Sequence, residues 1–262
     1  MAGEHFQPIA VRSPASHPWA FRLRCLVDLQ LATIARCLRP AMQELAGDVL
    51  DVGAGQSPWR EWLPPGVPYQ GIDVGYAADF GMQPSTPDVV YYDGTTMPLE
   101  SSTFDAVLCI EVLEHAPNPQ ALLLEMHRVM RLDALLLLTV PWSARRHHIP
   151  HDFYRFTREG LAHLLDKCGF VAIEVSERGN DIAAIANKLT VLSIRMLLPK
   201  KKLQVLLTWP LGLACGLLAG AFTLAAHICI ACGWGAKEDP LGYFVRARKG
   251  PLLTAANAEG LL

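Results

Sequence analysis

The segment Val49–Ser57, which reads VLDVGAGQS, constrains the fold of this chain more than any other segment. Its first four residues predict a short buried strand. Gly53 and Gly55 then let the backbone turn sharply and approach a ligand with no Cβ atom in the way. Ligands of open α/β sheets bind at the carboxyl ends of the strands, which is where this turn falls. The segment therefore predicts a strand, a ligand-binding turn and a following helix, although an ordinary tight turn is the alternative reading.

Short apolar runs alternate with segments of helical spacing from Asp48 onward. The clearest helical segments are Pro119–Met130 and Thr157–Cys168. This alternation predicts an α/β fold with a doubly wound, mostly parallel sheet. The candidate strands are Val49–Val52, Tyr69–Val74, Val89–Tyr92, Phe104–Ile110, Ala134–Val140 and Val171–Val175.

Acidic residues near the glycine turn indicate the class of ligand. Asp51 would repel the pyrophosphate of a dinucleotide, but it suits a ligand that carries an ammonium and a sulfonium. The dinucleotide pattern also needs a third glycine where Pro58 stands, so a nicotinamide-dependent oxidoreductase is disfavoured. Asp73 ends the next strand, where an acid can bind ribose hydroxyls. Asp93 ends the strand after that and could accept a hydrogen bond from an adenine amino group.

These motifs resemble the type 11 group of class I S-adenosylmethionine methyltransferases, over roughly residues 47–175. The residues that carry the resemblance are LDVGAG, GIDV, YYDGTTMPL, FDAVLCIEVLEH and HDFYRFTREGL. The resemblance implies a seven-stranded, Rossmann-like sheet that ends in an antiparallel hairpin, with Tyr243–Arg248 as the final strand. It also implies S-adenosylmethionine as the cofactor and an enzyme of the EC 2.1.1 type. The cofactor-binding residues that it implies are Asp51, Gly53, Ala54, Gly55, Asp73, Val74, Asp93, Gly94 and Glu111.

Candidate catalytic residues come from two places. The segment Arg145–Phe156 follows the fifth strand and should lie over the methyl donor. Within it, His151 is a candidate general base and Asp152 the acid that would orient it. Tyr154, or Arg155, could bind a polar acceptor. An alternative is that Asp152 pairs with Arg155 only to fix the loop. His115, at the end of the fourth strand, competes as the base, and no metal is expected because the histidine spacing in the loop matches no usual ligand motif.

The segment Leu203–Gly235 contains no Asp, Glu, Lys or Arg. This uncharged segment is longer than a bilayer span requires. Gly212, Gly216 and Gly220 are spaced for close helix packing, within the chain or in a homodimer. The preceding Lys200–Lys202 would favour an anionic membrane surface. We expect membrane contact, with a bend near Pro210 or one of the glycines that returns the chain to the same side, unless the final strand lies outside the sheet. A buried helical layer is the alternative to membrane contact.

The expected organisation is a helical cap (1–46), a cofactor-binding core (47–180), an apolar helical insertion (181–238), the last strand (239–250) and a tail (251–262). A net charge of −2 argues against nucleic acid as a partner. No apolar signal segment opens the chain, and seven cysteines predict reduced thiols, so a cytoplasmic location at the inner face of a membrane is expected.

The predicted function is methyl transfer to a small-molecule, lipid-linked or sugar-linked acceptor at the membrane surface. The alternative is a catalytically silent, membrane-tethered protein that keeps only the fold. The three acids Asp51, Asp73 and Asp93 argue against it, because a site without function has no need of these acids at these positions.

Overall fold

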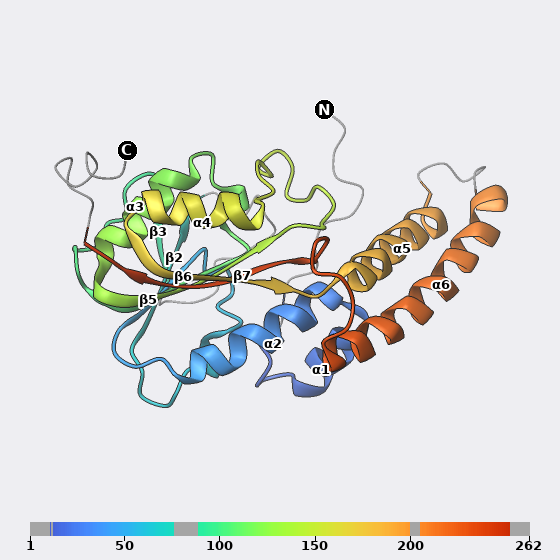
Figure 1. Ribbon diagram of the computed structural model, residues 1–262, viewed down its shortest axis with the longest axis horizontal. Coiled ribbons are helices and arrows are strands. Elements are labelled where there is room, and N and C mark those ends of the chain that lie inside the picture. Colours follow the sequence, from blue (N-terminus) through green and yellow to red (C-terminus); the bar gives the residue numbers. More distant parts are fainter. Residues whose placement is uncertain (1–10, 12, 76–88, 200–204, 252–262) are drawn as a thin grey trace.

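The computed structural model describes residue 11 and residues 13–75, 89–199 and 205–251. Seven strands form one sheet in the order β3-β2-β1-β4-β5-β7-β6 (Figure 1). The first five strands are parallel, and β7 is antiparallel to both of its neighbours. The strands are β1 (Val49–Val52), β2 (Tyr69–Val74), β3 (Val89–Tyr92), β4 (Phe104–Ile110), β5 (Met130–Pro141), β6 (Phe170–Arg178) and β7 (Gly242–Lys249). The predicted fold class is confirmed, including an apolar helix before the last strand.

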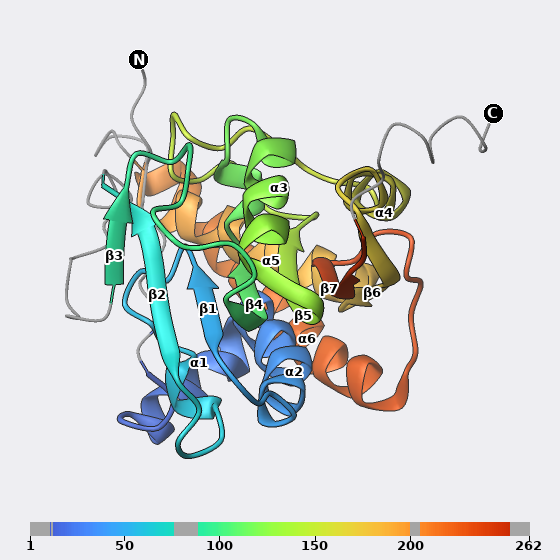
Figure 2. The ribbon, with the colours of Figure 1, turned by 90° about the vertical axis from the view of Figure 1, so that its left-hand side faces the viewer.

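Helices cover both faces of the sheet, with α2 on one face and α3 and α4 on the other (Figures 1 and 2). The α-helices are α1 (Pro18–Val27), α2 (Leu29–Gln43), α3 (Pro119–Val129), α4 (Arg158–Lys167), α5 (Asp181–Leu197) and α6 (Val205–Cys232). Within the expected N-terminal cap (1–46), the chain forms two helices, α1 and α2, rather than one continuous helix. The two helices are separated at Asp28, because its backbone leaves the helical region and its side chain accepts a hydrogen bond from Leu31 N at 3.1 Å, which caps α2.

Successive residues of the central strands point to opposite faces, so the sheet carries two cores. Leu136 of β5 packs in the core that includes Leu123 of α3 and Leu161 of α4. Its neighbour Leu137 packs in the second core, which includes Leu38 of α2. Burial on both faces explains why these strands read as continuous apolar runs.

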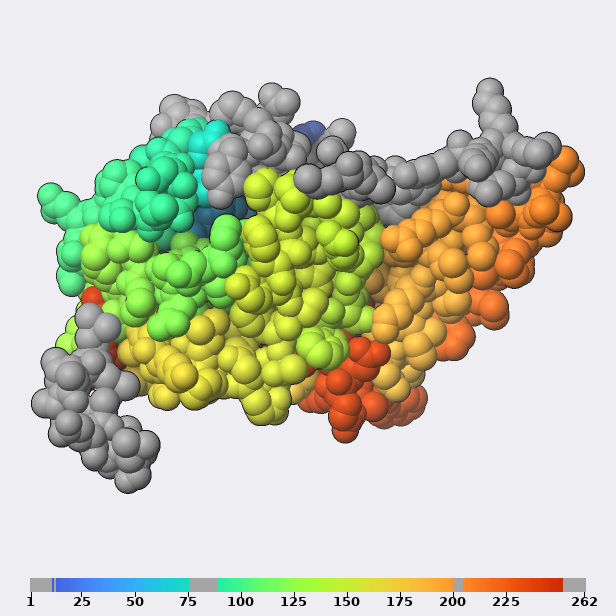
Figure 3. All heavy atoms as spheres, turned by 90° about the horizontal axis from the view of Figure 1, so that it is seen from above, coloured from blue at the N-terminus to red at the C-terminus, as the bar shows by residue number. Residues whose placement is uncertain are grey.

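The helices α5 and α6 pack against each other and extend beyond the sheet (Figures 1 and 3). A Cβ atom on Gly212 would lie 3.0 Å from Cβ of Met196, and one on Gly216 would lie 3.0 Å from Oγ of Ser193. The Ser193 hydroxyl also donates a hydrogen bond to the carbonyl of Gly212 at 2.8 Å. Two of the three spaced glycines therefore serve helix packing within the chain.

The bend that the sequence suggested near Pro210 is wrong, because α6 continues through this residue. The reversal lies between α5 and α6 instead, where Lys200–Lys202 fall outside the described residues, as does most of the C-terminal tail. Since β7 follows α6 and lies inside the sheet, both ends of the helical pair return to the same domain.

Arg178, at the end of β6, has no exposed surface and joins four parts of the fold. Its guanidinium donates to the carbonyls of Tyr243 on β7 at 3.2 Å and of Val140 on β5 at 3.2 Å. It also donates to Thr33 Oγ1 on α2 at 3.3 Å and forms an ion pair with Glu111 at 2.7 Å. A buried guanidinium is tolerated only when its donors and its charge are matched in this way.

We predict that Arg178→Met lowers the free energy of unfolding by about 3–5 kcal/mol, because it leaves the charge of Glu111 without its buried partner. Arg158→Met is the matched control, since Arg158 is exposed in its ion pair with Glu177. This substitution should lower the free energy of unfolding by less than about 1 kcal/mol. Urea unfolding of both variants measures the difference. Equal losses in the two variants would contradict the role assigned to Arg178.

Candidate cofactor and acceptor site

A cavity of about 650 Å³ opens at the carboxyl ends of β1, β2 and β4. The glycine turn after β1 and the ends of β2 and β4 line it on the sheet side. The first turn of α2, the start of α3 and the loop after β5 complete its walls. In the sheet order, the chain leaves β1 towards β2 on one side and returns through β4 on the other, and ligands of open α/β sheets bind at such a reversal.

The glycine turn brings the backbone close to the cavity. Gly53 has a φ of 72°, and its N–H donates to the carbonyl of Ile72 at 2.8 Å. A Cβ atom at this position would collide with the side chain of Val112. Gly55 also has a positive φ, of 52°. Because L side chains rarely adopt these conformations, the turn needs glycine at Gly53 for both backbone and steric reasons.

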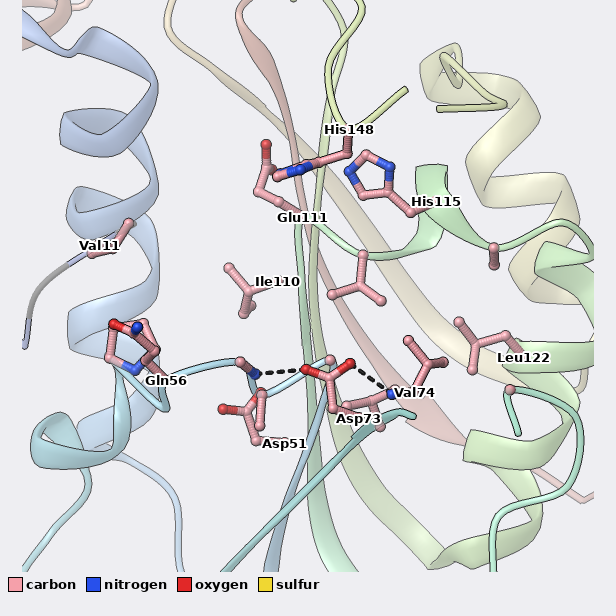
Figure 4. A pocket seen from close by; sticks show the side chains of 18 of the residues that line it. Val11, Asp51, Gln56, Asp73, Val74, Ile110, Glu111, His115, Leu122 and His148 are labelled. Atoms are coloured by element: carbon pink, nitrogen blue, oxygen red, sulfur yellow. Dashed lines mark hydrogen bonds between the residues drawn. The ribbon is translucent and has the colours of Figure 1, made fainter. Parts of the chain in front are cut away.

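Asp73, at the end of β2, is held by the glycine turn itself. Its carboxylate accepts hydrogen bonds from Gly55 N at 2.9 Å and from Val74 N at 2.7 Å (Figure 4). Burial raises the pKa of Asp73 above its ordinary value, and these two backbone hydrogen bonds oppose that shift. The residue is therefore fixed in orientation at the cavity wall.

Asp51 lies inside β1 and is only 2% exposed, although it lines the same cavity. The hydroxyl of Tyr69 donates a hydrogen bond to its Oδ2 at 2.8 Å. Burial raises the pKa of Asp51 to about 7, and the hydrogen bond from Tyr69 only partly offsets this effect. A cationic ligand group beside Asp51 would stabilise its charged form.

Asp93 and Gly94 lie at the more open side of the cavity. The Asp93 carboxylate accepts hydrogen bonds from Oγ1 of Thr95 at 2.6 Å and from its backbone N at 2.9 Å. The Thr95 side chain lowers the pKa of Asp93, so this residue is a fixed acceptor. Ala54 and Val74 also line the cavity.

Glu111 follows β4 and is the remaining predicted cofactor residue. It has a φ of 57°, which is rare for a residue with a side chain, and its N–H donates to Oγ1 of Thr139 at 3.1 Å. Its carboxylate pairs with Arg178 and lines the cavity. The buried guanidinium therefore fixes one acid of the candidate site.

Three histidines line the cavity together, apart from Asp51 and Asp73 (Figure 4 labels His115 and His148). The ring centroids of His115 and His147 are 4.8 Å apart, and His148 is 5.2 Å from each. Burial, followed by the charge of His147, lowers the pKa of His115 to about 4. His115 is therefore neutral at physiological pH.

The other three predicted catalytic residues do not line this cavity. The backbone carbonyl of His151 accepts a hydrogen bond from Nδ1 of His115 at 2.7 Å, and the hydroxyl of Tyr154 donates to the carbonyl of Pro117 at 3.2 Å. Asp152 pairs with Arg155 at 2.6 Å and accepts from the N–H of His147 at 3.0 Å. Although burial raises the pKa of Asp152, the hydrogen bond from Arg155 keeps it below the ordinary value. The geometry thus matches the alternative in which Asp152 and Arg155 fix the loop.

Sequence reasoning missed three residues of the site. Arg178 and Tyr69 hold Glu111 and Asp51 from other strands, and no local motif marks them. Glu114 is fully buried and lies beside the histidines, with its Oε1 3.5 Å from Nε2 of His115. The neighbouring glutamate and histidine were visible as a pair in the sequence, but their contact with the loop after β5 was not.

Comparison with known proteins identifies the class of this domain. Residues 50–138 match the family model described as "Methyltransferase domain", which is the type 11 group predicted above. No curated protein matches the chain. The predicted resemblance to this family is therefore confirmed over residues 50–138, and it supports S-adenosylmethionine as the cofactor.

Solved structures agree on the fold. A SAM-dependent methyltransferase from Archaeoglobus fulgidus has a TM-score of 0.51 at 16% identity, over 88% of this chain and 100% of that one. A SAM-dependent methyltransferase from Thermotoga maritima has a TM-score of 0.51 at 13% identity, over 90% of this chain and 94% of that one. The [4+2]-cyclase SpnF has a TM-score of 0.50 at 16% identity, over 84% of this chain and 82% of that one. At these identities the likeness concerns the fold alone.

We predict that Asp51→Asn stabilises the ligand-free protein at pH 8 by roughly 2–4 kcal/mol. The folded-state pKa of about 7 exceeds the unfolded value, so the wild type loses stability as the pH rises from about 4 to 7, whereas asparagine does not ionise. Asparagine also keeps an acceptor for Tyr69. Urea unfolding at pH 4 and pH 8 measures the effect, and a stability difference that does not change with pH would contradict this assignment.

Proposed function

We propose that this protein transfers the methyl group of S-adenosylmethionine to a small-molecule, lipid-linked or sugar-linked acceptor at a membrane surface. One observation carries the transfer itself: the strained glycine turn, Asp51 and Asp73 line one cavity at the carboxyl ends of β1 and β2. The backbone of this turn lines the cavity directly because Gly53 has no side chain. The donor set also fits the cofactor, since it offers two carboxylates, Asp51 and Asp73, beside the glycine turn.

When bound, S-adenosylmethionine supplies a methyl group that is already activated for in-line displacement. The protein then needs to bind the donor and the acceptor, align them and exclude water. We assign Asp51, Gly53, Ala54 and Gly55 to the methionine part, Asp73 and Val74 to the ribose, and Asp93 and Gly94 to the adenine. Glu111, held by Arg178, lies between the cofactor residues and the histidines, which we assign to the acceptor end.

His115 is the candidate general base that lines the cavity. It is neutral at physiological pH, as a base must be, and its Nδ1 is held by the carbonyl of His151. His151 and Tyr154 therefore support this end of the site through contacts outside the cavity lining. Asp152 holds the backbone of His147 rather than the ring of His151.

The membrane part of the proposal comes from α6. Among the described residues, it is the one helix that is long and apolar enough to cross a membrane by length and composition. Its 28 residues span about 42 Å, and large apolar side chains remain exposed along it, such as Leu206 (83%) and Leu217 (79%). An apolar surface of this extent marks contact with a membrane or a partner.

We propose that α6 lies in the plane of the membrane surface. A crossing α6 would require α5 to cross back, but α5 has 17 residues and carries Lys188 and Arg195 within its length. Charged residues at such positions are costly in a bilayer. An in-plane helix needs no return crossing and keeps β7 in the sheet.

The same surface extends towards the cavity through α1. His227 of α6 bonds through Nε2 to the carbonyl of Leu26 at 3.0 Å, so the two helices lie side by side. Trp19 and Leu23 of α1 are 79% and 67% exposed. Arg24, on the same helix, lines the cavity. A lipid-linked acceptor could therefore reach the histidine end directly from the membrane.

Calorimetric titration with S-adenosylmethionine, S-adenosylhomocysteine and NADH tests the cofactor assignment. We predict binding of the first two, and a 10- to 100-fold loss in Asp73→Asn, because a charged hydrogen-bond acceptor is worth about 1.5–3 kcal/mol. Asp166→Asn on α4 is the matched control and should bind like the wild type. Folded protein that binds only NADH, or nothing, would overturn the proposal. Cofactor binding without labelled methyl transfer to any membrane extract would favour the silent alternative.

Vesicle flotation tests the role of α6. We predict that Leu206→Ser combined with Leu217→Ser lowers binding to anionic vesicles at least tenfold, because each change removes about 1 kcal/mol or more of apolar burial. Leu132→Ser with Val171→Ser is the matched control, since both residues are exposed but lie away from the helical pair. A vesicle affinity that is the same in both double variants would rule out α6 as the contact.

A further inference from the structure

His115, His147 and His148 bring three ligand nitrogens within 4.8 Å of one another. They come from two separate loops, since His115 follows β4 whereas the other two follow β5. Histidine spacing in one loop could not reveal this set, because the sequence places the first ligand more than thirty residues before the others.

The orientation of two rings prepares them to bind a cation. Nδ1 of His115 bonds to the carbonyl of His151 at 2.7 Å, and Nδ1 of His147 bonds to the carbonyl of Arg145 at 3.1 Å. A carbonyl only accepts, so a neutral His115 ring carries its proton on Nδ1 and its lone pair on Nε2. Nδ1 of His147 lies between the Arg145 carbonyl and Nη2 of Arg155, which is 3.5 Å away, and these two groups hold that ring in place. Metal-binding histidines are held in this way, with one nitrogen bonded to a carbonyl or carboxylate and the other directed at the ion.

Glu114 provides the second, independent observation. It has no exposed surface, and neither of its carboxylate oxygens has a hydrogen-bond partner among the described residues. Its Oε1 lies 3.5 Å from Nε2 of His115 and 4.0 Å from Nε2 of His147. A buried carboxylate without a partner is costly, and a cation would remove that cost.

These distances suit a metal ion. With bonds of 2.0–2.1 Å, neighbouring ligands of a tetrahedral zinc site lie about 3.3 Å apart. The Glu114 and His115 atoms are already close to this spacing. Nε2 of His147 lies 4.0 Å from Oε1 of Glu114, and the three histidine ligand atoms lie within 4.8 Å of one another, so the rings on the loop after β5 must move towards the ion to complete the set. Nitrogen and oxygen ligands of this kind suit divalent first-row metals.

We infer that His115, His147, His148 and Glu114 form a binding site for a divalent first-row transition metal, such as Zn²⁺, at the acceptor end of the cavity. The histidines line the cavity, so the ion faces the space where the acceptor binds. Resting on the proposed function, this placement replaces the general-base role of His115, whose Nε2 would bind the ion. It selects acceptors that present a metal-binding oxygen, such as a hydroxyl, because the ion would orient that oxygen and lower its pKa.

Metal titration of the full chain, stripped with a chelator and free of any affinity tag, tests this site. We expect one equivalent of Zn²⁺ to bind with a dissociation constant on the order of 1 μM or lower, and Co²⁺ to give the visible absorption of a four- or five-coordinate site. Zn²⁺ should also raise the melting temperature.

His148→Gln and Glu114→Gln should each weaken Zn²⁺ binding at least tenfold. His163→Gln on the exposed face of α4 is the matched control and should not change it. His148→Gln keeps the test decisive if Glu114→Gln does not fold, because His148 is only half-buried in a loop. Absence of Zn²⁺ binding by folded, stripped protein, or binding unchanged in both variants, would overturn the inference.

A parallel titration of the stripped protein with S-adenosylmethionine separates this inference from the proposed function. Cofactor binding without Zn²⁺ binding would overturn the metal site alone. Zn²⁺ binding at these residues without cofactor binding would support the metal site and overturn the methyl-transfer assignment.

Discussion

The buried ion pair between Arg178 and Glu111 links the sheet to the site more directly than any other interaction. The guanidinium lies where β6, β7, β5 and α2 meet, and it donates hydrogen bonds to backbone carbonyls of β5 and β7 and to Thr33 of α2. Its charge is matched by Glu111, which follows β4 and lines the cavity. Because a buried charge requires its partner, the position of Glu111 is coupled to the packing of the antiparallel end of the sheet. The cavity therefore depends on strands that lie on both sides of it.

The cavity itself combines two chemically different ends. At one end, the backbone of the glycine turn and the carboxyl groups of Asp51 and Asp73 line the cavity. Burial raises the pKa of Asp51 to about 7. At the other end, His115, His147 and His148 gather beside the fully buried Glu114. The parallel strands bring both ends together because their carboxyl termini lie at the same edge of the sheet. Separation of donor and acceptor chemistry within one enclosed space suits a transfer between two bound molecules.

The helices outside the core extend this arrangement to the surface. The α5–α6 pair uses Gly212 and Gly216 for its own packing, so its outer face stays apolar and exposed. Contact between α6 and α1 continues that face up to the helix that carries Arg24 of the cavity wall. The proposed cofactor and acceptor ends of the cavity and the apolar surface are thus neighbours in space, although residues from 19 to 232 contribute to them.

The sequence by itself determined the parts of this protein that depend on local patterns. Alternating apolar runs and helical segments predicted the doubly wound sheet, and the glycine turn with Asp51 and Asp73 predicted the cofactor end, because strand periodicity and backbone sterics act over a few residues. Only the tertiary structure decided the break at Asp28, the continuation of α6 through Pro210, the burial of Arg178 and the meeting of His115 with His147 and His148. Each of these depends on contacts between segments far apart in the chain. The local motif HDFYRF pointed to His151, whereas packing holds that residue by its carbonyl and turns the two earlier histidines into the cavity.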